Sequence, residues 1–196
     1  NELSLADVGL HKADALKDRL VTLNPQCEVR ALRLSIGGQE SSRSMSGTLE
    51  SLGDCDILID ATAEPVAFNI VASISLRQMK PMIWGEVFAG GIGGLVARAR
   101  PKADPTPLAS RNQIQAWCQD QNIEWKRHTT DGLYNGRDEE GRLLIADDAE
   151  VSIIASHIVR FATDILVRPD DSIFPVSAYL VGFSSEWIFE QPFETF

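Results

Sequence analysis

The stretch Asp56-Ile57-Leu58-Ile59-Asp60 decides the fold class of this 196-residue chain. It is a short apolar run between two carboxylates, which is typical of a strand that a parallel sheet buries on both faces. Residues 64–79 follow with a helical pattern, and Pro65 suits the first turn of that helix. Residues 81–86 then have the pattern of the next strand. This strand–helix–strand order predicts an α/β sheet with crossover helices.

The segment before this unit also alternates between helix and strand patterns. Residues 5–23 carry apolar side chains at helical spacing, and Asn24-Pro25 ends the predicted helix. Residues 27–34 alternate apolar and polar side chains, which predicts a half-exposed strand. Residues 36–47 are rich in glycine and serine and predict a loop. We expect a short helix over residues 48–54.

A different pattern begins after the second strand of this unit. Residues 83–88 and 95–100 predict two antiparallel strands that a flexible glycine-rich turn joins. The turn, Gly-Gly-Ile-Gly-Gly at 90–94, is not G-x-G-x-x-G and precedes no helix pattern, so we do not expect it to bind phosphate. Residues 101–107 contain three prolines and predict a rigid, polar crossover.

The C-terminal part predicts two helices, a loop and two strands. Residues 109–121 have a helical pattern, and residues 126–144 predict a long surface loop. A second helix is expected from residue 147 to 168, because acidic residues fill its first turn and an apolar face follows. Short strands are expected at 177–183 and 186–190. The predicted fold is therefore α/β, with an antiparallel strand extension and a C-terminal helix.

Charge and composition exclude several classes of protein. Lys and Arg number 18 and Asp and Glu 28, and the net charge of −10 disfavours binding to nucleic-acid backbones or anionic membranes. The sequence has no apolar run of about 18 residues and no signal peptide. The three cysteines lack CxxC spacing, which indicates free thiols in a reducing compartment. We therefore expect a cytoplasmic protein without a membrane or nucleic-acid partner.

Several motifs follow one another as they do in one enzyme superfamily. They are Val8-Gly9-Leu10-His11-Lys12-Ala13, Leu23-Asn24-Pro25 with Glu28-Val29, the stretch 54–62, and Lys80-Pro81 with Trp84-Gly85. In their order and spacing over residues 6–101, the chain resembles the ThiF/MoeB/HesA-type adenylating enzymes of bacteria, relatives of the ubiquitin-activating enzymes.

The resemblance implies the second half of a Rossmann-like ThiF-type domain. In the family, the glycine-rich nucleotide loop, a ribose-binding acidic residue and an Asn…Arg pair lie upstream of the first motif. Residues 1–101 would be the C-terminal part of the adenylation domain, and residues 102–196 the crossover loop, helices and closing strands of the same domain. We expect this piece alone to be inactive, and to form a homodimer or to assemble with the missing N-terminal half.

The activity that the resemblance implies is ATP-dependent adenylation with Mg²⁺. The substrate would be the C-terminal carboxylate of a ubiquitin-like or sulfur-carrier protein. Two other classes stay open: a catalytically inactive adenylase-like scaffold, and a fragment of an NAD(P)-dependent Rossmann oxidoreductase. An upstream G-x-G-x-x-G with an acidic residue about 20 positions later would indicate the oxidoreductase.

The resemblance also assigns residues to the ATP site. Lys12 would contact an ATP phosphate from the start of its helix, or be a solvated surface lysine. Asp60 ends a strand, where a carboxylate can hold Mg²⁺ or a ribose hydroxyl; the alternative is that Asp60 or Thr62 caps the next helix. The family motif DxTDN has its second aspartate, the expected Mg²⁺ ligand, where this chain has Ala63. Either Asp60 or Glu64 takes the metal role, or metal-dependent adenylation is impaired. The predicted cofactor-binding residues are Lys12, Asp60, Thr62 and Glu64, with Asp60 as the metal ligand.

Cys118 is the candidate catalytic nucleophile. Many family members transfer the activated carrier to a cysteine beyond the Arg-Pro that follows the sheet, and Cys118 is the only cysteine after Arg100-Pro101. Its thiolate would attack the acyl-adenylate and form a thioester. The alternative is a buried helix cysteine beside Trp117, without a cation within three residues to lower its pKa.

The resemblance further implies a channel for the tail of the carrier protein near the strand 95–100. Trp84, Phe88 and Arg98 would line that channel. The two aromatic side chains are equally consistent with core packing.

Overall fold

The computed structural model describes residues 4–34, 36, 42–88, 91, 93–121, 135–137 and 143–183. After a short 3₁₀ turn, η1 (Leu5–Asp7), its helices are α1 (Lys12–Leu23), α2 (Ser42–Gly53), α3 (Pro65–Gln78), α4 (Pro107–Asp120) and α5 (Asp148–Val167). Its strands are β1 (Leu58–Asp60), β2 (Met82–Val87), β3 (Gly93–Ala99), β4 (Asn135–Arg137), β5 (Leu143–Ile145) and β6 (Ala178–Gly182).

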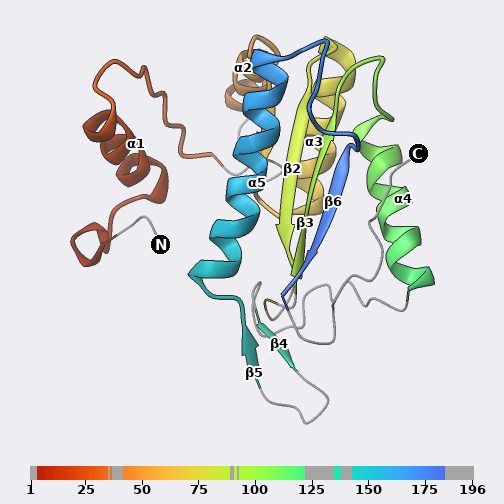
Figure 1. Cartoon of the computed structure of the whole chain (residues 1–196). Coiled ribbons are helices and arrows are strands. Elements are labelled where there is room, and N and C mark those ends of the chain that lie inside the picture. Colours follow the sequence, from red (N-terminus) through yellow and green to blue (C-terminus); the bar gives the residue numbers. More distant parts are fainter. Residues whose placement is uncertain are drawn as a thin grey trace.

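The main sheet has four strands in the order β1-β2-β3-β6 (Figure 1). β1 and β2 run parallel, with Asp60 opposite Trp84, and the crossover helix α3 joins them. β3 pairs antiparallel with both β2 and β6. The predicted α/β class, with its antiparallel extension and C-terminal helix, is confirmed. β4 and β5 form a separate two-stranded hairpin, seen below the sheet in Figure 1.

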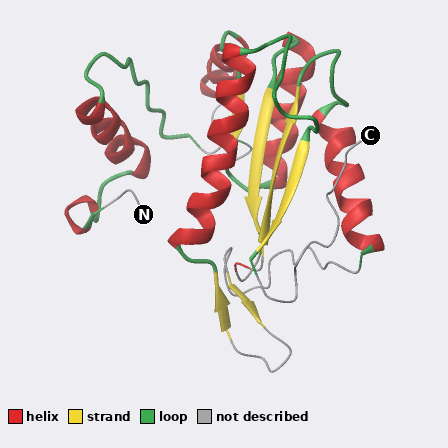
Figure 2. Cartoon of the chain, viewed as in Figure 1, coloured by secondary structure: helices red, strands yellow, loops and turns green. Residues whose placement is uncertain are grey.

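Helices cover both faces of the sheet, as Figure 2 shows. On one face, α3 and α4 pack over a core that includes Phe68, Trp84 and Ile114. On the other face, α5 packs over β2 and β3, and its Ile154 and Phe161 belong to a second core. The molecule is therefore a three-layer sandwich around the sheet.

Capping residues and a proline in the sequence determine where α3 and α5 begin. α3 begins with Pro65 in its first turn, directly after the N-cap Glu64. α5 begins with a capping box, in which Asp147 accepts a hydrogen bond from the backbone N–H of Ala149 and Glu150 accepts one from Asp147. Both predicted helices are confirmed within one or two residues at each end.

The prediction that both faces of the first strand are buried is wrong for β1. Leu58 and Asp60 are buried on the α3 face, but Ile59 is 48% exposed on the opposite face. β1 is an edge strand of the described sheet, and α5 packs on β2 and β3. No described element therefore covers Ile59.

The predicted strand at residues 27–34 is also wrong, because these residues form no strand. In Figure 1, α1 and the extended segment after it stand apart from the sheet. A strand needs hydrogen bonds to a neighbouring backbone, and this segment pairs with no described strand. Apolar and polar side chains alternate in this segment as they do in a strand, but the described part of the chain offers no neighbouring strand with which it pairs.

Other boundaries differ from the predictions. α2 begins at Ser42 rather than at residue 48, and α4 begins at Pro107 because Thr106 caps it. The predicted loop 126–144 contains β4 and the first residues of β5. The rest of that loop and the predicted strand 186–190 lie outside the described residues. Among the described helices, none is both long and apolar enough to cross a membrane.

A buried ion pair ties β3 to α5. Arg98 donates a hydrogen bond of 2.8 Å to Asp164 and one of 2.9 Å to the hydroxyl of Ser172. Trp84, Phe88 and Arg98 are at most 3% exposed. The prediction that they line a channel for a carrier tail is therefore wrong: Trp84 and Phe88 fill the core beneath α3 and α4, and Arg98 belongs to the ion-pair network.

Candidate functional site

The carboxyl end of β1 forms a hydrogen-bonded turn that leads into α3. The Asp60 Oδ1 atom accepts a 3.0 Å hydrogen bond from the Thr62 backbone N–H and a 2.7 Å bond from the Thr62 hydroxyl. The Thr62 hydroxyl oxygen in turn accepts a 3.1 Å bond from the backbone N–H of Glu64. The structure therefore brings together three of the four predicted cofactor-binding residues in one turn.

This turn lies where open α/β sheets bind ligands, beyond the carboxyl ends of parallel strands. Asp60 is 5% exposed, whereas Thr62 and Glu64 are exposed. The buried carboxylate organises the turn, and the exposed side chains face solvent. Both readings of Asp60, as a site residue and as part of the helix entry, agree with this geometry.

Ala63 has a left-handed backbone within the same turn, with a φ of +56°. An alanine there costs roughly 1 kcal/mol relative to an ordinary conformation, and glycine, asparagine and aspartate adopt it more readily. The hydrogen bonds of the Asp60–Thr62–Glu64 turn stabilise this backbone against that cost. The missing family aspartate thus corresponds to a position whose conformation suits aspartate better than alanine.

A cavity of about 170 Å³ lies between this turn and the first half of α5. Ala61, Thr62 and Ala63 form one wall. The other walls come from the end of β2 and from one face of α5, namely Gly85, Glu86, Val87, Val151, Ile154, Ala155 and Ile158. Asp60 and Glu64 do not line it. The cavity is therefore mainly apolar, with Thr62 and Glu86 as its polar lining residues.

Two glycines let α5 approach the sheet beside this cavity. A Cβ at Gly85 would lie 2.5 Å from the Ile158 Cδ1 atom of α5, and a Cβ at Gly94 would lie 2.8 Å from the Ile154 Cδ1 atom of α5. The Gly94 Cβ would also lie 2.7 Å from the Glu86 carbonyl oxygen of the neighbouring strand β2. Sequence reasoning missed the residues that β2 and α5 contribute to the cavity walls. They lie far apart in the chain, and a glycine in a strand gives only the general signal of close approach.

Glu86 is held on the opposite face of β2 from α5. The Arg111 Nη2 atom of α4 lies 3.6 Å from the Glu86 Oε2 atom. The Arg111 guanidinium also lies 4.4 Å from the ring centre of Phe68, which meets Trp84 edge-on at 5.4 Å. The Trp84 Nε1 atom is buried and has no hydrogen-bond partner among the described residues. This cluster fixes the end of β2 from the face of the sheet opposite α5.

The acidic residues of the turn fit a magnesium site that uses few protein ligands. No cluster of three or more His, Cys, Asp or Glu side chains able to hold a metal occurs among the described residues. Mg²⁺ in phosphate-binding sites commonly takes one or two carboxylates and fills its shell with water and phosphate oxygens. The second oxygen of Asp60 accepts no hydrogen bond from a described residue. Asp60 is thus able to serve as such a ligand.

Lys12 is placed away from this turn. It is the first residue of α1, which begins at residue 12 and not at residue 5 as the predicted helix 5–23 did, and its side chain is exposed. Figure 1 shows α1 separated from the sheet. The structure therefore does not bring Lys12 to Asp60, and its role in phosphate binding stays a prediction.

Cys118 lies in α4 on the side of the sheet opposite α5. Its side chain is 1% exposed and belongs to the core with Ile114. Burial raises the pKa of the Cys118 thiol to about 11. Cys27 and Cys55 are exposed and free. The thioester role of Cys118 stays a prediction, and the described geometry favours the core-packing alternative.

Comparisons with known proteins agree with the fold. A family model described as the ThiF family matches residues 3–166. MccB of E. coli, solved with ATP, superposes with a TM-score of 0.62 at 14% sequence identity, over 92% of this chain and 47% of that one. PaaA superposes with a TM-score of 0.63 at 17% identity, over 94% of this chain and 55% of that one. This chain thus spans about half the length of each of these proteins. No curated protein matches it.

Proposed function

This chain belongs to the ThiF family, and on that premise we propose that it is part of an ATP-dependent adenylyltransferase. The observation that carries the proposal is the Asp60–Thr62–Glu64 turn at the carboxyl end of β1, beside a cavity of about 170 Å³. The fold shared with MccB, a protein solved with ATP, adds support. The same family membership favours adenylation over the nicotinamide-dependent alternative.

The proposed reaction activates a carboxylate. A carboxylate oxygen attacks the α-phosphorus of ATP, a new P–O bond forms, and the bond from the α-phosphorus to the bridging oxygen breaks. Pyrophosphate leaves with that electron pair and an acyl-adenylate remains. Because negative charge builds up on the phosphate oxygens, positive charge placed there lowers the barrier. Family membership suggests the C-terminus of a ubiquitin-like or sulfur-carrier protein as the carboxylate substrate.

Asp60 is the proposed magnesium ligand, and Glu64 is the second candidate in the same turn. Bound Mg²⁺ would offset charge on the phosphates of ATP. Thr62 would keep the Asp60 carboxylate oriented through its two hydrogen bonds. Lys12 would add a second positive charge, which requires α1 to lie closer to the turn than it does here.

ATP–pyrophosphate exchange tests this proposal in the full-length protein with its carrier substrate. We expect Lys12→Ala to reduce exchange at least tenfold, because one phosphate contact is removed. Asp60→Asn is expected to reduce it similarly and to raise the Mg²⁺ concentration needed for half-maximal rate. Lys17→Ala, on the exposed side of the same helix, is the matched control. Unchanged exchange in both site variants contradicts the proposal.

A catalytically inactive adenylase-like scaffold is the second candidate, and Ala63 favours it. If the missing aspartate has removed metal-dependent adenylation, the parent protein shows no exchange. The variant Ala63→Asp would then restore Mg²⁺-dependent nucleotide binding, because the left-handed backbone at this position accepts aspartate. Titration of both proteins with ATP, with and without Mg²⁺, separates the two candidates.

A further inference from the structure

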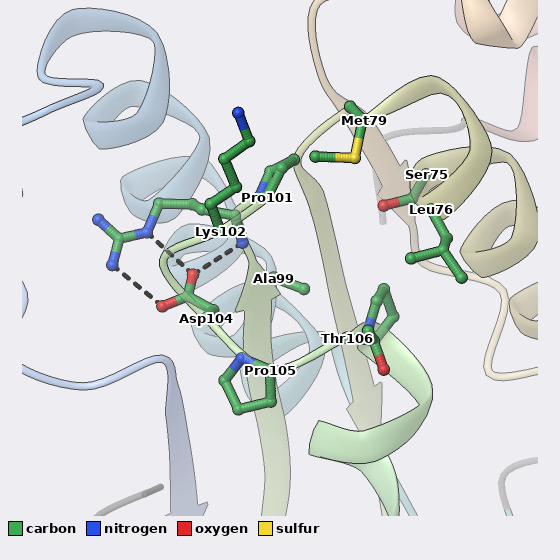
Figure 3. A pocket seen from close by; sticks show the side chains of 11 residues that line it. Ser75, Leu76, Met79, Ala99, Pro101, Lys102, Asp104, Pro105 and Thr106 are labelled. Carbon is green, nitrogen blue, oxygen red and sulfur yellow. Dashed lines mark hydrogen bonds and ion pairs between the residues drawn. The ribbon is translucent and has the colours of Figure 1, made fainter.

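A second cavity lies at the end of the sheet opposite the Asp60 turn. It is enclosed by the last turn of α3, the end of β3 and the crossover that begins α4, and its volume is about 90 Å³ (Figure 3). Ala99 at the end of β3 lines it and pairs with Met82, the first residue of β2. The proposed nucleotide site adjoins the other end of β2. The two cavities are thus separated by the length of that strand.

The walls of this second cavity are apolar and rigid. Leu76, Met79 and Ala99 contribute apolar side chains, and the crossover adds three prolines at positions 101, 105 and 107. In Figure 3 the Met79 side chain points toward Pro101. Proline fixes the backbone φ angle, so this wall loses little entropy when a ligand binds.

Hydrogen bonds hold the crossover in place behind the cavity. Both oxygens of Asp104 accept hydrogen bonds from the Arg100 guanidinium, at 2.9 and 3.0 Å. The Ser177 hydroxyl donates a third bond of 2.6 Å from the segment before β6. Although burial favours a higher pKa for Asp104, these hydrogen bonds outweigh it and hold that pKa below its usual value. The one acidic side chain of the lining is therefore neutralised within the protein.

The rim of the cavity carries the positive charge of Lys102. Lys102 lines the cavity, is exposed, and makes no ion pair with any residue in the described part of the chain. The chain as a whole has a net charge of −10. Lys102 thus places a positive charge at the edge of this cavity on a protein that is acidic overall.

Exposed apolar side chains surround the same opening. Leu76 is 57% exposed and Met79 49%, and both line the cavity. The volume of about 90 Å³ is larger than the roughly 10–15 Å³ that a single water requires and smaller than the ~150 Å³ of a cavity that binds benzene. It suits an aliphatic side chain such as leucine or valine rather than an aromatic ring.

We propose that this cavity is a docking site for an acidic peptide segment of a partner protein. One aliphatic side chain of the segment enters the cavity between Leu76 and Pro101, and a neighbouring carboxylate pairs with Lys102. Because the segment binds at the opposite end of β2 from the proposed nucleotide site, the two sites do not compete. The inference does not depend on the adenylyltransferase proposal.

Selection from a random nine-residue peptide display library on the full chain tests the proposal. We expect the selected peptides to share an aliphatic residue within two positions of an aspartate or glutamate. For one selected peptide, fluorescence anisotropy gives the Kd. Replacing its aliphatic residue by serine, or its acidic residue by the amide, is expected to weaken binding at least tenfold. A selection without this pattern overturns the proposal.

Variants of the protein locate the binding. We expect Lys102→Glu to weaken peptide binding at least tenfold and Leu76→Ser to weaken it at least fivefold, whereas Lys17→Glu, an equal change of charge on α1, alters it less than twofold. Lys102→Gly is a second charge-removing variant that keeps the fold, because Lys102 has a left-handed φ of +69° that glycine adopts readily. Binding that survives both Lys102 variants overturns the proposal. A concentration-dependent dimer that Lys102→Glu dissolves would instead identify a second copy as the occupant and also overturn it.

Discussion

The Arg98 guanidinium of β3 lies 2.8 Å from the Asp164 carboxylate of α5, and both side chains are almost wholly buried. Asp164 also accepts hydrogen bonds from the Ser172 hydroxyl at 2.6 Å and from the Ile173 backbone N–H at 3.2 Å. The Arg98 guanidinium lies 4.8 Å from the ring centre of Phe161. One polar network therefore joins the sheet, the end of α5 and the segment that leads to β6.

Breaking this ion pair from one side is expected to destabilise the protein strongly. Arg98→Met or Asp164→Leu alone leaves a buried charge without its partner, and we expect each to lower the free energy of unfolding by about 3–5 kcal/mol. The double variant removes both charges and is expected to lose less than either single variant. Urea unfolding followed by circular dichroism measures all four proteins, and additive losses in the double variant would contradict the coupling.

The same network predicts how stability depends on pH. Hydrogen bonds from Ser172, Ile173 and Arg98 hold the pKa of Asp164 below its usual value, although burial alone acts in the opposite direction. The unfolded chain takes up protons near the ordinary aspartate pKa of about 3.9. The stabilisation is therefore fully present above about pH 4 and is lost as pH falls through the lower pKa of the folded protein.

Urea unfolding at pH 6, 4 and 3 tests this dependence. We expect the stability of the parent protein to fall between pH 4 and 3, with Asp104 contributing in the same direction. Asp104→Asn should have a shallower fall over that range. Asp120→Asn, an exposed position at the end of α4, is the control and should follow the parent. A stability that rises as the pH is lowered to 3 would contradict the prediction.

Sequence patterns predicted the central unit of the fold because each of its signals is local. The apolar run of β1, the proline at the start of α3 and the acidic first turn of α5 each act within a few residues. The strand predicted at 27–34 was wrong because a strand also needs a neighbour, which a pattern of alternation does not supply. The exposure of Ile59 was missed for a similar reason: burial depends on which helix covers an edge strand.

The candidate site was predictable only in part. Asp60, Thr62 and Glu64 are adjacent in sequence, so one strand–helix turn places them together. The α5 wall of the cavity comes from residues almost a hundred positions later, and no local pattern marks Ile154 or Ile158 as anything but core residues. The second cavity forms only when the crossover 101–107 folds against α3 and β3. From the sequence, the prolines of the crossover indicated a rigid segment but gave no sign of a cavity.

Cys118 is expected to be unreactive in the folded protein. With a pKa of about 11, roughly one thiol in 10⁴ is ionised at pH 7, and the side chain is also shielded from solvent. A thiol-specific chromogenic reagent should modify Cys27 and Cys55 quickly and Cys118 only when urea unfolds the chain. Rapid modification of all three thiols under native conditions would contradict this prediction and support the thioester role of Cys118. Cys118→Ala is expected to cost about 1 kcal/mol of stability and to leave ATP–pyrophosphate exchange unchanged.

Ala63→Gly is expected to leave stability unchanged within about 0.5 kcal/mol. Glycine relieves the left-handed strain at φ +56°, and this gain offsets its greater freedom in the unfolded chain. Ala61→Gly, two residues earlier at a position without a positive φ, lacks the gain and is expected to cost about 0.4–1 kcal/mol. Thermal unfolding of the two variants provides the comparison. A larger loss for Ala63→Gly than for Ala61→Gly would show that the turn is not strained.

The two glycines beneath α5 are expected to differ in their tolerance of a methyl group. At Gly94 a Cβ meets the Glu86 carbonyl oxygen, which the β2–β3 pairing fixes, so Gly94→Ala should cost about 2–3 kcal/mol. At Gly85 the nearest atom is the end of the Ile158 side chain, which can rotate, so Gly85→Ala should cost about 1 kcal/mol and reduce the cavity beside Thr62. Gly47→Ala, inside α2 with open space around it, should stabilise the protein by about 0.5–1 kcal/mol. Urea unfolding of the three variants gives the ranking, and a greater loss at Gly85 than at Gly94 would mean that α5 cannot adjust over the sheet.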